Sequence, residues 1–336
     1  MEKYSKWRDP STGVAPFLYP LSPATTTLPP IARFVTLPLT TTVGAVRTLL
    51  LVLLVLAQTI LVEGVLSLLS IYPPVYRPIA RACNASICRL ILVVFGIFSI
   101  PVETILLRKT GRSPPQAAFE PKQGDVIVAN SSSYLDLFYL AFRHNVTFLL
   151  PVIDSSDKVT GWKRVSLIRA LWTNGRIPER SVASASGETL EVAIKNARGP
   201  VVVFPECTTS NNRALLKFPS LSPTSLRVAP GSRIFVLTFK YCQPTRFTPS
   251  LTHPIPAHSP FLGPLPHLFS VLSTLTIHSF SIRRLHPTES PKSLEGTENG
   301  QNLEDVVATT GRFKKLGGLG WIEKRAFLEF RRIKGR

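Results

Sequence analysis

The sequence predicts an α/β protein in which a mostly parallel β-sheet with flanking helices follows an N-terminal helical membrane hairpin. Two observations indicate this fold class. Apolar residues fill two long runs before residue 108, and from about residue 112 short β-branched runs alternate with helix-like segments. Alternating strands and helices favour a parallel sheet covered by helices. With 336 residues, the chain is long enough for one medium domain with a full-sized core and additional segments.

Charge and hydropathy together restrict the partners that the chain can have. Hydrophobic residues make up 44% of the sequence, and 39 Lys and Arg residues stand against 20 Asp and Glu residues, a net charge of +19. This apolar content excludes a disordered basic protein, and the positive balance indicates an anionic membrane surface as a partner. Because no base-reading element is recognisable, no nucleic-acid partner is expected. The four cysteines and six histidines lack metal-ligand spacing, so we expect no metal site and no bound cofactor.

The N-terminal part is expected to hold a proline-rich segment and then the hairpin. Seven prolines in residues 1–42 predict an extended or disordered segment, because proline interrupts helices. The hairpin is expected over residues 43–109, with membrane segments at about 48–70 and 87–107. The first segment is nearly all Leu, Val and Ile over more than twenty residues, and about 20 helical residues cross the hydrocarbon core of a bilayer.

The second apolar segment, residues 87–107, is the weaker of the two. Arg89, Pro101 and Glu103 interrupt it, so a re-entrant or interfacial segment is the alternative to a second span. Three basic residues follow it between positions 108 and 112. Since basic residues flank membrane segments on the cytosolic side, they predict that the downstream domain faces the cytosol.

The rest of the chain is expected to comprise a globular domain over residues 110–285, a linker over residues 286–311 and a basic amphipathic tail over residues 312–336. Strands are expected at 124–130, 146–152, 199–206 and 232–241, and helices at 134–143 and 187–198. The tail carries nine Lys or Arg residues and two Glu residues among apolar side chains, a pattern that suits an anionic membrane face. A helix packed on the domain with a solvated basic face is the alternative.

Two polar segments directly follow predicted strands. Residues 130–136 read Asn-Ser-Ser-Ser-Tyr-Leu-Asp, and residues 204–210 read Phe-Pro-Glu-Cys-Thr-Thr-Ser. The carboxyl ends of parallel strands form the edge of a sheet where substrates bind, so we expect the two segments to meet there. Polar residues at such turns also serve as helix caps, which is the structural alternative.

These two segments resemble motifs of the PlsC-type glycerolipid acyltransferases, in particular of a fungal-type lysophosphatidate acyltransferase subgroup. In the family the first motif reads Asn-His-x-x-x-x-Asp and the third reads Phe-Pro-Glu-Gly-Thr-Arg-Ser. The resemblance covers about residues 90–245 and implies a membrane-anchored glycerol-3-phosphate acyltransferase-like domain. The residues at matching positions are Asn130, Ser133, Asp136, Phe204, Pro205, Glu206, Thr208 and Ser210.

The resemblance also implies roles for residues in this chain. Ser131 and Asp136 stand at the catalytic positions, where the family's His acts as general base on the acceptor hydroxyl and the Asp orients that His. A middle motif with an Arg and the Glu-containing motif bind the glycerol phosphate of the acceptor. The residues expected to bind substrate are Asn130, Ser133, Arg176, Arg180, Pro205, Glu206, Thr208, Ser210, Arg213 and Lys217.

Three departures from the family's pattern bear on activity. Ser131 replaces the catalytic His, and a positioned base is worth about 10²–10⁴-fold in rate. Thr209 replaces the third motif's Arg, and Cys207 replaces its Gly. The apolar fourth motif of the family is only loosely matched, with Pro230 as its best anchor.

The resemblance implies acyl transfer from acyl-CoA, as co-substrate, to a lysophospholipid, in the first place lysophosphatidate. A catalytically inactive lipid-binding or trafficking protein on the same fold is the alternative, because Ser131 lacks the basicity of a histidine. Membrane lipids are the expected partners, and the oligomeric state stays open. The expected location is the endoplasmic reticulum membrane with the domain facing the cytosol, and a hairpin also permits a lipid-droplet surface.

Overall fold

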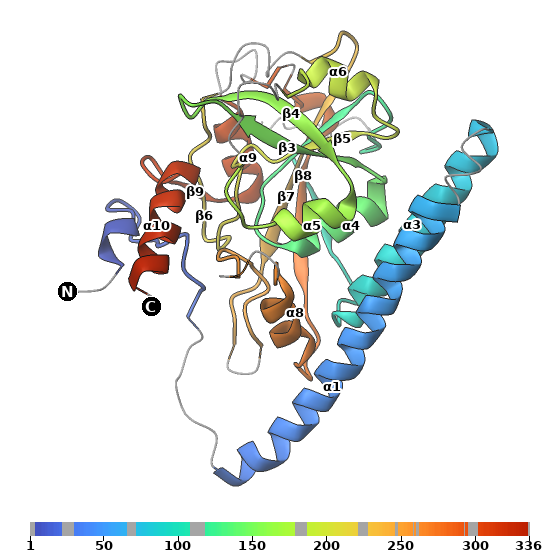
Figure 1. Ribbon diagram of the computed structural model, residues 1–336. Coiled ribbons are helices and arrows are strands. Elements are labelled where there is room, and N and C mark those ends of the chain that lie inside the picture. The colour runs from blue at the N-terminus through green and yellow to red at the C-terminus, as the bar shows by residue number, and fades with distance from the viewer. Residues whose placement is uncertain are drawn as a thin grey trace.

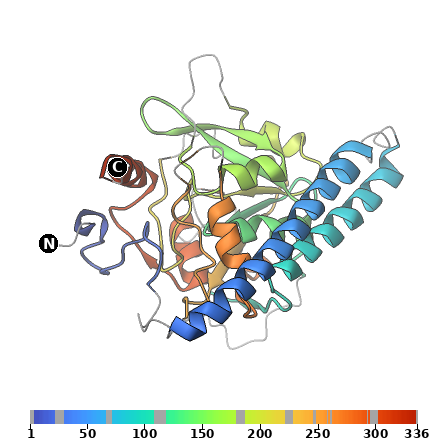
Figure 2. The ribbon, with the colours of Figure 1, turned by 60° about the horizontal axis from the view of Figure 1, so that its bottom comes forward.

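The computed structural model describes residues 4–21, 30–65, 72–107, 118–178, 187–220, 228–245, 248–257, 259, 262–291, 293–294 and 302–334. Two long helices lie side by side on one flank of the molecule, and both ends of the chain lie on the opposite flank (Figures 1 and 2). A mixed sheet with helices on both faces lies between them.

The flanking helices form a hairpin. Helix α1 (Pro30–Ala57) continues into the π-helical segment η2 (Gln58–Val65), and α3 (Pro73–Val94) returns antiparallel to it (Figure 2). Among the described helices, one stretch, Thr36–Leu61, has the length and apolar composition needed to cross a bilayer. Its outward side chains are apolar and largely exposed, as at Leu49 and Leu53.

The second apolar segment, expected at 87–107, does not form one helix, and this prediction was wrong. Helix α3 ends at Val94, and Leu92 and Phe95 are fully buried against the domain. The chain then enters strand β1 (Val102–Ile105) at the edge of the sheet. An apolar run has the same composition in a protein core as in lipid, so sequence alone did not separate the two.

The expectation of an extended or disordered segment over residues 1–42 was also wrong where the structure describes it. Residues 30–42 form the first turns of α1. Proline is compatible with a first helical turn, and Pro38 costs one backbone hydrogen bond in a long apolar helix that continues past it. Residues 4–21 include the short 3₁₀ helix η1 (Ser5–Trp7) and bury Trp7 and Phe17 against the C-terminal helix.

The main sheet has seven strands in the order β1-β8-β7-β2-β5-β3-β4. The bounds of the strands not yet given are β2 (Val126–Ala129), β3 (Thr147–Ile153), β4 (Val159–Val165), β5 (Val201–Val203), β7 (Ile234–Tyr241) and β8 (Phe280–Leu285). Four neighbouring pairs are parallel, and β3–β4 and β7–β8 are antiparallel, which confirms the prediction of a mostly parallel sheet. A second, two-stranded sheet joins β6 (Ala214–Leu215) to β9 (Lys314–Lys315).

Side chains of the central strands alternate between two apolar cores. Ile127 and Ala129 of β2 face a core shared with α3, α4 (Tyr134–His144) and α8 (Leu265–Leu272). Val126 and Val128 face the other core, shared with α6 (Leu190–Lys195) and α9 (Leu303–Gly311). Buried strands covered on both faces explain the continuous apolar runs in the sequence. The remaining described helices are α5 (Leu167–Thr173), α10 (Trp321–Lys334) and the 3₁₀ helix η4 (Pro287–Glu289).

The C-terminal part of the chain belongs to the domain. Helix α9 lies within the segment expected to be a linker, and it buries Val306 and Val307. Helix α10 packs on the domain through Trp321 and Phe327, so the alternative of a packed tail helix holds. The N-terminal segment packs on it in turn, with the ring centroids of Phe17 and Phe327 5.7 Å apart.

Candidate active site at the carboxyl edge of the sheet

The structure brings the two polar segments together where β2 and β5 end. The Ser210 amide donates a hydrogen bond to the Ser131 carbonyl oxygen at 3.1 Å. The Ser131 amide in turn donates to Glu206 Oε1 at 2.9 Å. We call this region, residues 130–136 and 204–212, the motif edge.

Asp136 holds the first segment in place from the first turn of α4. Ser133 caps the helix, and its amide and that of Ser132 donate to Asp136 Oδ2 at 2.9 and 2.8 Å. The Tyr241 hydroxyl donates to Asp136 Oδ1. Full burial raises the pKa of Asp136 to about 7, although these three hydrogen bonds oppose the shift. The carboxyl group therefore has no open side toward a ligand, and it organises the loop.

Glu206 has a similar role between the two segments. It is fully buried, and in addition to the Ser131 amide it accepts a hydrogen bond from the Leu216 amide at 3.1 Å through Oε2. Burial raises the pKa of Glu206 to about 8. The family resemblance assigns this residue to substrate binding, but here it joins three stretches of backbone within the protein.

Asparagines attach the motif edge to strand β7. Asn130 Oδ1 accepts from the Phe239 amide at 2.7 Å. Asn212 donates through Nδ2 to the Phe239 carbonyl oxygen at 2.8 Å and accepts from the Tyr241 amide at 2.9 Å. Asn212 has a φ of 61°, a conformation that asparagine tolerates better than most residues. These amides complete the hydrogen bonding of the strand end.

A buried lysine from α10 reaches the position where the family's third motif has an arginine. Lys324 is fully buried, and its Nζ donates to the Thr209 carbonyl oxygen at 2.7 Å and to Thr209 Oγ1 at 3.1 Å. Burial lowers the pKa of Lys324 to about 7, and the nearby charge of Glu206 opposes this shift. The amino group of Lys324 thus contacts residue 209 from a helix more than one hundred residues away in sequence.

A narrow cavity of about 260 Å³ opens beside the motif edge, and we call it the motif pocket. Three predicted site residues line it: Ser131, Thr208 and Arg176. Cationic Lys163 and Arg169 and apolar Leu137, Phe148, Leu150, Ile177 and Phe204 complete much of its wall. Asn174 also lines it, and its buried Oδ1 has no hydrogen-bond partner among the described residues. The pocket therefore combines cationic groups with an apolar wall.

The other predicted site residues lie elsewhere. The predicted site residues buried in the motif edge are Asn130, Ser133, Asp136, Pro205, Glu206 and Ser210. Arg213 and Lys217 have exposed side chains outside the described lining of the motif pocket. Arg180 lies outside the described residues.

His253 lies against the first segment, but it is a poor substitute for the missing histidine. Its amide donates to the Ser132 carbonyl oxygen at 2.7 Å, and its own carbonyl oxygen accepts from Thr209 Oγ1 at 2.6 Å. Burial lowers the pKa of His253 to about 2, so the ring is a weak base. Its backbone contacts make it part of the frame around the motif pocket.

Sequence reasoning missed several residues that shape this site. The sequence held one indication that Lys324 is buried. It is spaced three residues from Trp321 and from Phe327, and so lies on the apolar face of an amphipathic helix. For Tyr241 and His253 the sequence held no such indication, because their contacts with the first segment depend on the tertiary fold. In the sequence, nothing distinguishes Lys163 and Arg169 from ordinary surface cations.

Comparison with known proteins agrees with the motif resemblance. No protein-family model matches the chain. The chain is 29% identical over 336 residues to a protein of the fission yeast Schizosaccharomyces pombe named "Putative lysophosphatidic acid:oleoyl-CoA acyltransferase", and the match covers 98% of each chain. Among solved structures, the crystal structure of the 1-acyl-sn-glycerophosphate (LPA) acyltransferase PlsC from Thermotoga maritima is similar, with a TM-score of 0.40 and 15% identity over 80% of this chain and 95% of that chain. The resemblance to a fungal lysophosphatidate acyltransferase is thus confirmed, and it extends over nearly the whole chain.

Proposed function

We propose that the protein is a membrane-associated acyltransferase that moves a fatty acyl group from acyl-CoA to the free hydroxyl of lysophosphatidate, forming phosphatidate and CoA. The observation that carries this proposal is the motif pocket, which Ser131, Thr208 and Arg176 line together with an apolar wall. A phosphate group suits the cationic side, and an acyl chain suits the apolar side. The name of the fission yeast relative supports the same reaction.

The reaction needs only the two substrates for its balance. The hydroxyl oxygen of lysophosphatidate attacks the thioester carbonyl carbon, and the carbon–sulfur bond breaks. The CoA thiolate leaves and takes up the proton that the hydroxyl loses. The protein supplies position and orientation, which alone lower a barrier substantially. Because Ser131 is not a base at neutral pH, we expect slower turnover than a histidine at this position would give.

Arg176 is the residue whose replacement tests this reaction. Purified protein in mixed micelles would be assayed for transfer of radiolabelled acyl groups from acyl-CoA to lysophosphatidate. We expect Arg176→Gln to raise the KM for lysophosphatidate by about tenfold or more, because a charged hydrogen bond to phosphate is lost. Arg213→Gln is the matched control, since Arg213 is exposed outside the pocket. Equal KM values for the two variants would contradict the assignment of the motif pocket.

The absence of a histidine at position 131 favours a second candidate function. On this reading the protein binds lipid at the motif pocket without catalysis, as a lipid-binding or trafficking protein. The same assay separates the two functions. Acyl transfer by the wild type supports the enzyme, whereas no transfer by the wild type and a gain in Ser131→His would indicate an inactive site.

The proposed location is the endoplasmic reticulum membrane or a lipid-droplet surface, with the motif edge facing the cytosol. The apolar, exposed face of α1 supports membrane attachment. Carbonate extraction of microsomes would test attachment, and protection of epitope tags from protease would test the orientation. Complete protection of a tag on the C-terminal helix in intact microsomes would contradict the cytosolic orientation.

A further inference from the structure

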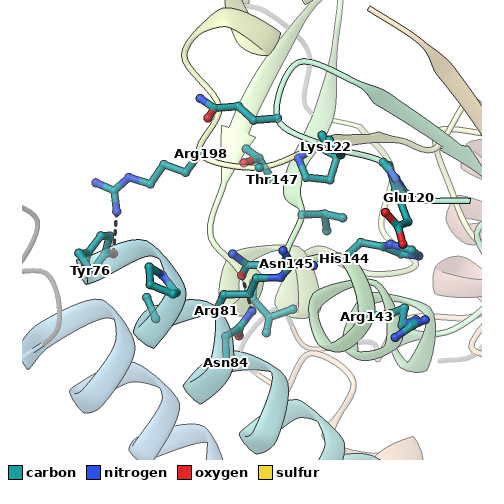
Figure 3. A pocket seen from close by; sticks show the side chains of 18 of the residues that line it. Tyr76, Arg81, Asn84, Glu120, Lys122, Arg143, His144, Asn145, Thr147 and Arg198 are labelled. Carbon is teal, nitrogen blue, oxygen red and sulfur yellow. Dashed lines mark hydrogen bonds between the residues drawn. The ribbon is translucent and has the colours of Figure 1, made fainter. Parts of the chain in front are cut away.

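A second and larger cavity lies at the opposite end of α4 from the motif edge. Its volume is about 1140 Å³, and we call it the basal cavity. Helix α4 begins beside the motif edge at Tyr134 and ends ten residues later at His144, in the wall of the basal cavity. The two sites are therefore separated by ~15 Å along the helix. Figure 3 shows that α3, the end of α4 and the loops before β2 and β5 all contribute side chains to it.

The described lining of the basal cavity is strongly cationic. It contains four cationic side chains and one carboxylate, and these residues are Arg81, Lys122, Arg143, Arg198 and Glu120. Within the part of the chain that the structure describes, no ion pair joins any of the four cations to a carboxylate. Stabilisation of the last turn of α4 accounts for a cation at Arg143. It does not account for the other three.

Half-buried His144 and buried Gln58, both in the wall of the basal cavity, indicate the chemistry of a ligand that would fit it. The pKa of His144 is lowered to about 4, first by burial and then by the charges of Arg143, Arg284 and Arg81. The surroundings of His144 thus disfavour another positive charge. Gln58 also lines the cavity, and its buried Oε1 accepts no hydrogen bond from any described residue. A ligand that suits these surroundings carries an anionic group, which the arginines near His144 can bind. It also carries a hydroxyl group that can donate a hydrogen bond to Gln58 Oε1.

The basal cavity adjoins the membrane-facing hairpin. Its wall includes Gln58 at the start of η2 and Arg81 on α3. Exposed apolar side chains occupy the same helical segments, at Ile60, Leu61 and Ile79. An amphiphile can therefore place a charged head group in the cavity while its chains lie along the hairpin.

We propose that the basal cavity binds the phosphate-bearing head group of an anionic membrane glycerophospholipid, at a site separate from the motif pocket. The arginines bind the phosphodiester, and Gln58 accepts a hydrogen bond from a hydroxyl of the head group. A bound lipid would connect the hairpin to the base of the sheet and so fix the domain against the membrane. The nucleotide of CoA, which also carries phosphate, is the competing ligand that the experiment must distinguish.

The test measures binding of a soluble short-chain phosphatidylglycerol to the full chain in neutral detergent by titration calorimetry. Phosphatidylglycerol is neither substrate nor product of the proposed reaction, so its binding reports on the basal cavity. We expect the double variant Arg81→Gln/Arg143→Gln to raise the Kd by about tenfold or more, since two charged contacts to phosphate are lost. Both side chains are exposed, so the variant should melt near the wild-type temperature, and Arg81→Gln alone serves if it does not.

Two controls make the outcome specific. Lys158→Gln/Lys195→Gln removes the same charge at exposed positions that line neither cavity, and its Kd should equal that of the wild type. Arg176→Gln should also bind phosphatidylglycerol normally, which separates this site from the proposed acyltransferase site.

Three results would overturn the proposal. One is that the wild type does not bind phosphatidylglycerol. Another is that the two double variants lose binding equally. The third is that adenosine 3′,5′-bisphosphate displaces phosphatidylglycerol, which would assign the basal cavity to the nucleotide of CoA.

Discussion

The charged side chains at the two ends of α4 differ in burial and in hydrogen bonding. At the motif edge, Asp136 and Glu206 are fully buried, and each oxygen of their carboxyl groups accepts a hydrogen bond from the protein. At the basal cavity, Arg81 and Arg143 are exposed and have no carboxylate partner among the described residues. The motif residues Asp136 and Glu206 thus hold the backbone around a site together and leave no carboxyl oxygen for a ligand. Groups able to bind a ligand lie beside them, or at the other end of the helix.

The largest expected effect is on the motif edge. Glu206→Ala leaves the amides of Ser131 and Leu216 buried without acceptors, and we expect it to lower the free energy of unfolding by about 2–5 kcal/mol. Glu206→Gln keeps one acceptor oxygen and should cost about half as much. Urea unfolding of the full chain in detergent measures both. An alanine variant as stable as the glutamine variant would show that Glu206 does not brace the loops.

A smaller effect is expected where β7 meets the first segment. Tyr241→Phe removes the hydroxyl that donates to Asp136, while the two amide donors of that carboxyl group remain. We expect a loss of about 1–3 kcal/mol in the free energy of unfolding, because the acceptor is charged or strongly polar and fully buried. Tyr72→Phe, at an exposed tyrosine, is the matched control and should change nothing measurable. If both variants unfold alike, the hydrogen bond to Asp136 contributes little.

At the basal cavity the expected effect depends on pH. The folded-state pKa of His144, about 4, lies below its ordinary value of 6.5, so its contribution to stability is present above pH 6.5 and is lost as the pH falls toward 4. His144→Gln has no such loss. Between about pH 8 and about pH 5, wild-type stability should fall by about 1–2 kcal/mol more than that of the variant. Parallel pH profiles of melting temperature for the two proteins would contradict this.

The smallest effect is expected at the rim of the same cavity. The Tyr76 hydroxyl accepts a hydrogen bond from Arg198 at 3.1 Å, and the guanidinium group lies 5.8 Å from the centre of the ring. Tyr76→Phe removes the hydrogen bond and keeps the ring, so the free energy of unfolding should fall by less than about 1 kcal/mol. A larger fall in urea unfolding would make Arg198 a structural residue and weaken the contrast with the motif edge.

Local pattern was enough to predict four neighbouring strands of the sheet, β7, β2, β5 and β3, and the meeting of the two polar segments. The short apolar runs at 124–130 and 199–206 become β2 and β5, which pair in parallel. Their carboxyl ends then bring Ser131 and Glu206 together. Periodicity likewise predicted the helix that becomes α6. Each of these inferences needed only the residues of one segment and a rule for how parallel strands end.

The features that the sequence did not reveal depend on contacts between distant segments. Strand β1 lies in a run that looks like the end of a membrane segment, and only its pairing with β8, 180 residues later, makes it a strand. Lys324 looks like one of many cations in a basic tail, and its burial against Thr209 follows from the docking of α10. The frame-building role of Glu206 was hidden for the same reason, because its partners are backbone amides that carry no sequence signal.

The contact between Lys324 and Thr209 has a consequence for the order of assembly during synthesis. Residues 204–212 emerge from the ribosome long before Lys324, and until then the Thr209 carbonyl oxygen lacks this partner. The packing of the N-terminal segment is delayed as well, because its Phe17 packs against Phe327 of α10. The hairpin is therefore complete early in translation, whereas the motif edge receives its last contact only near the end. A ribosome stalled just before α10 would leave the hairpin fully synthesised and the motif edge without its last contact.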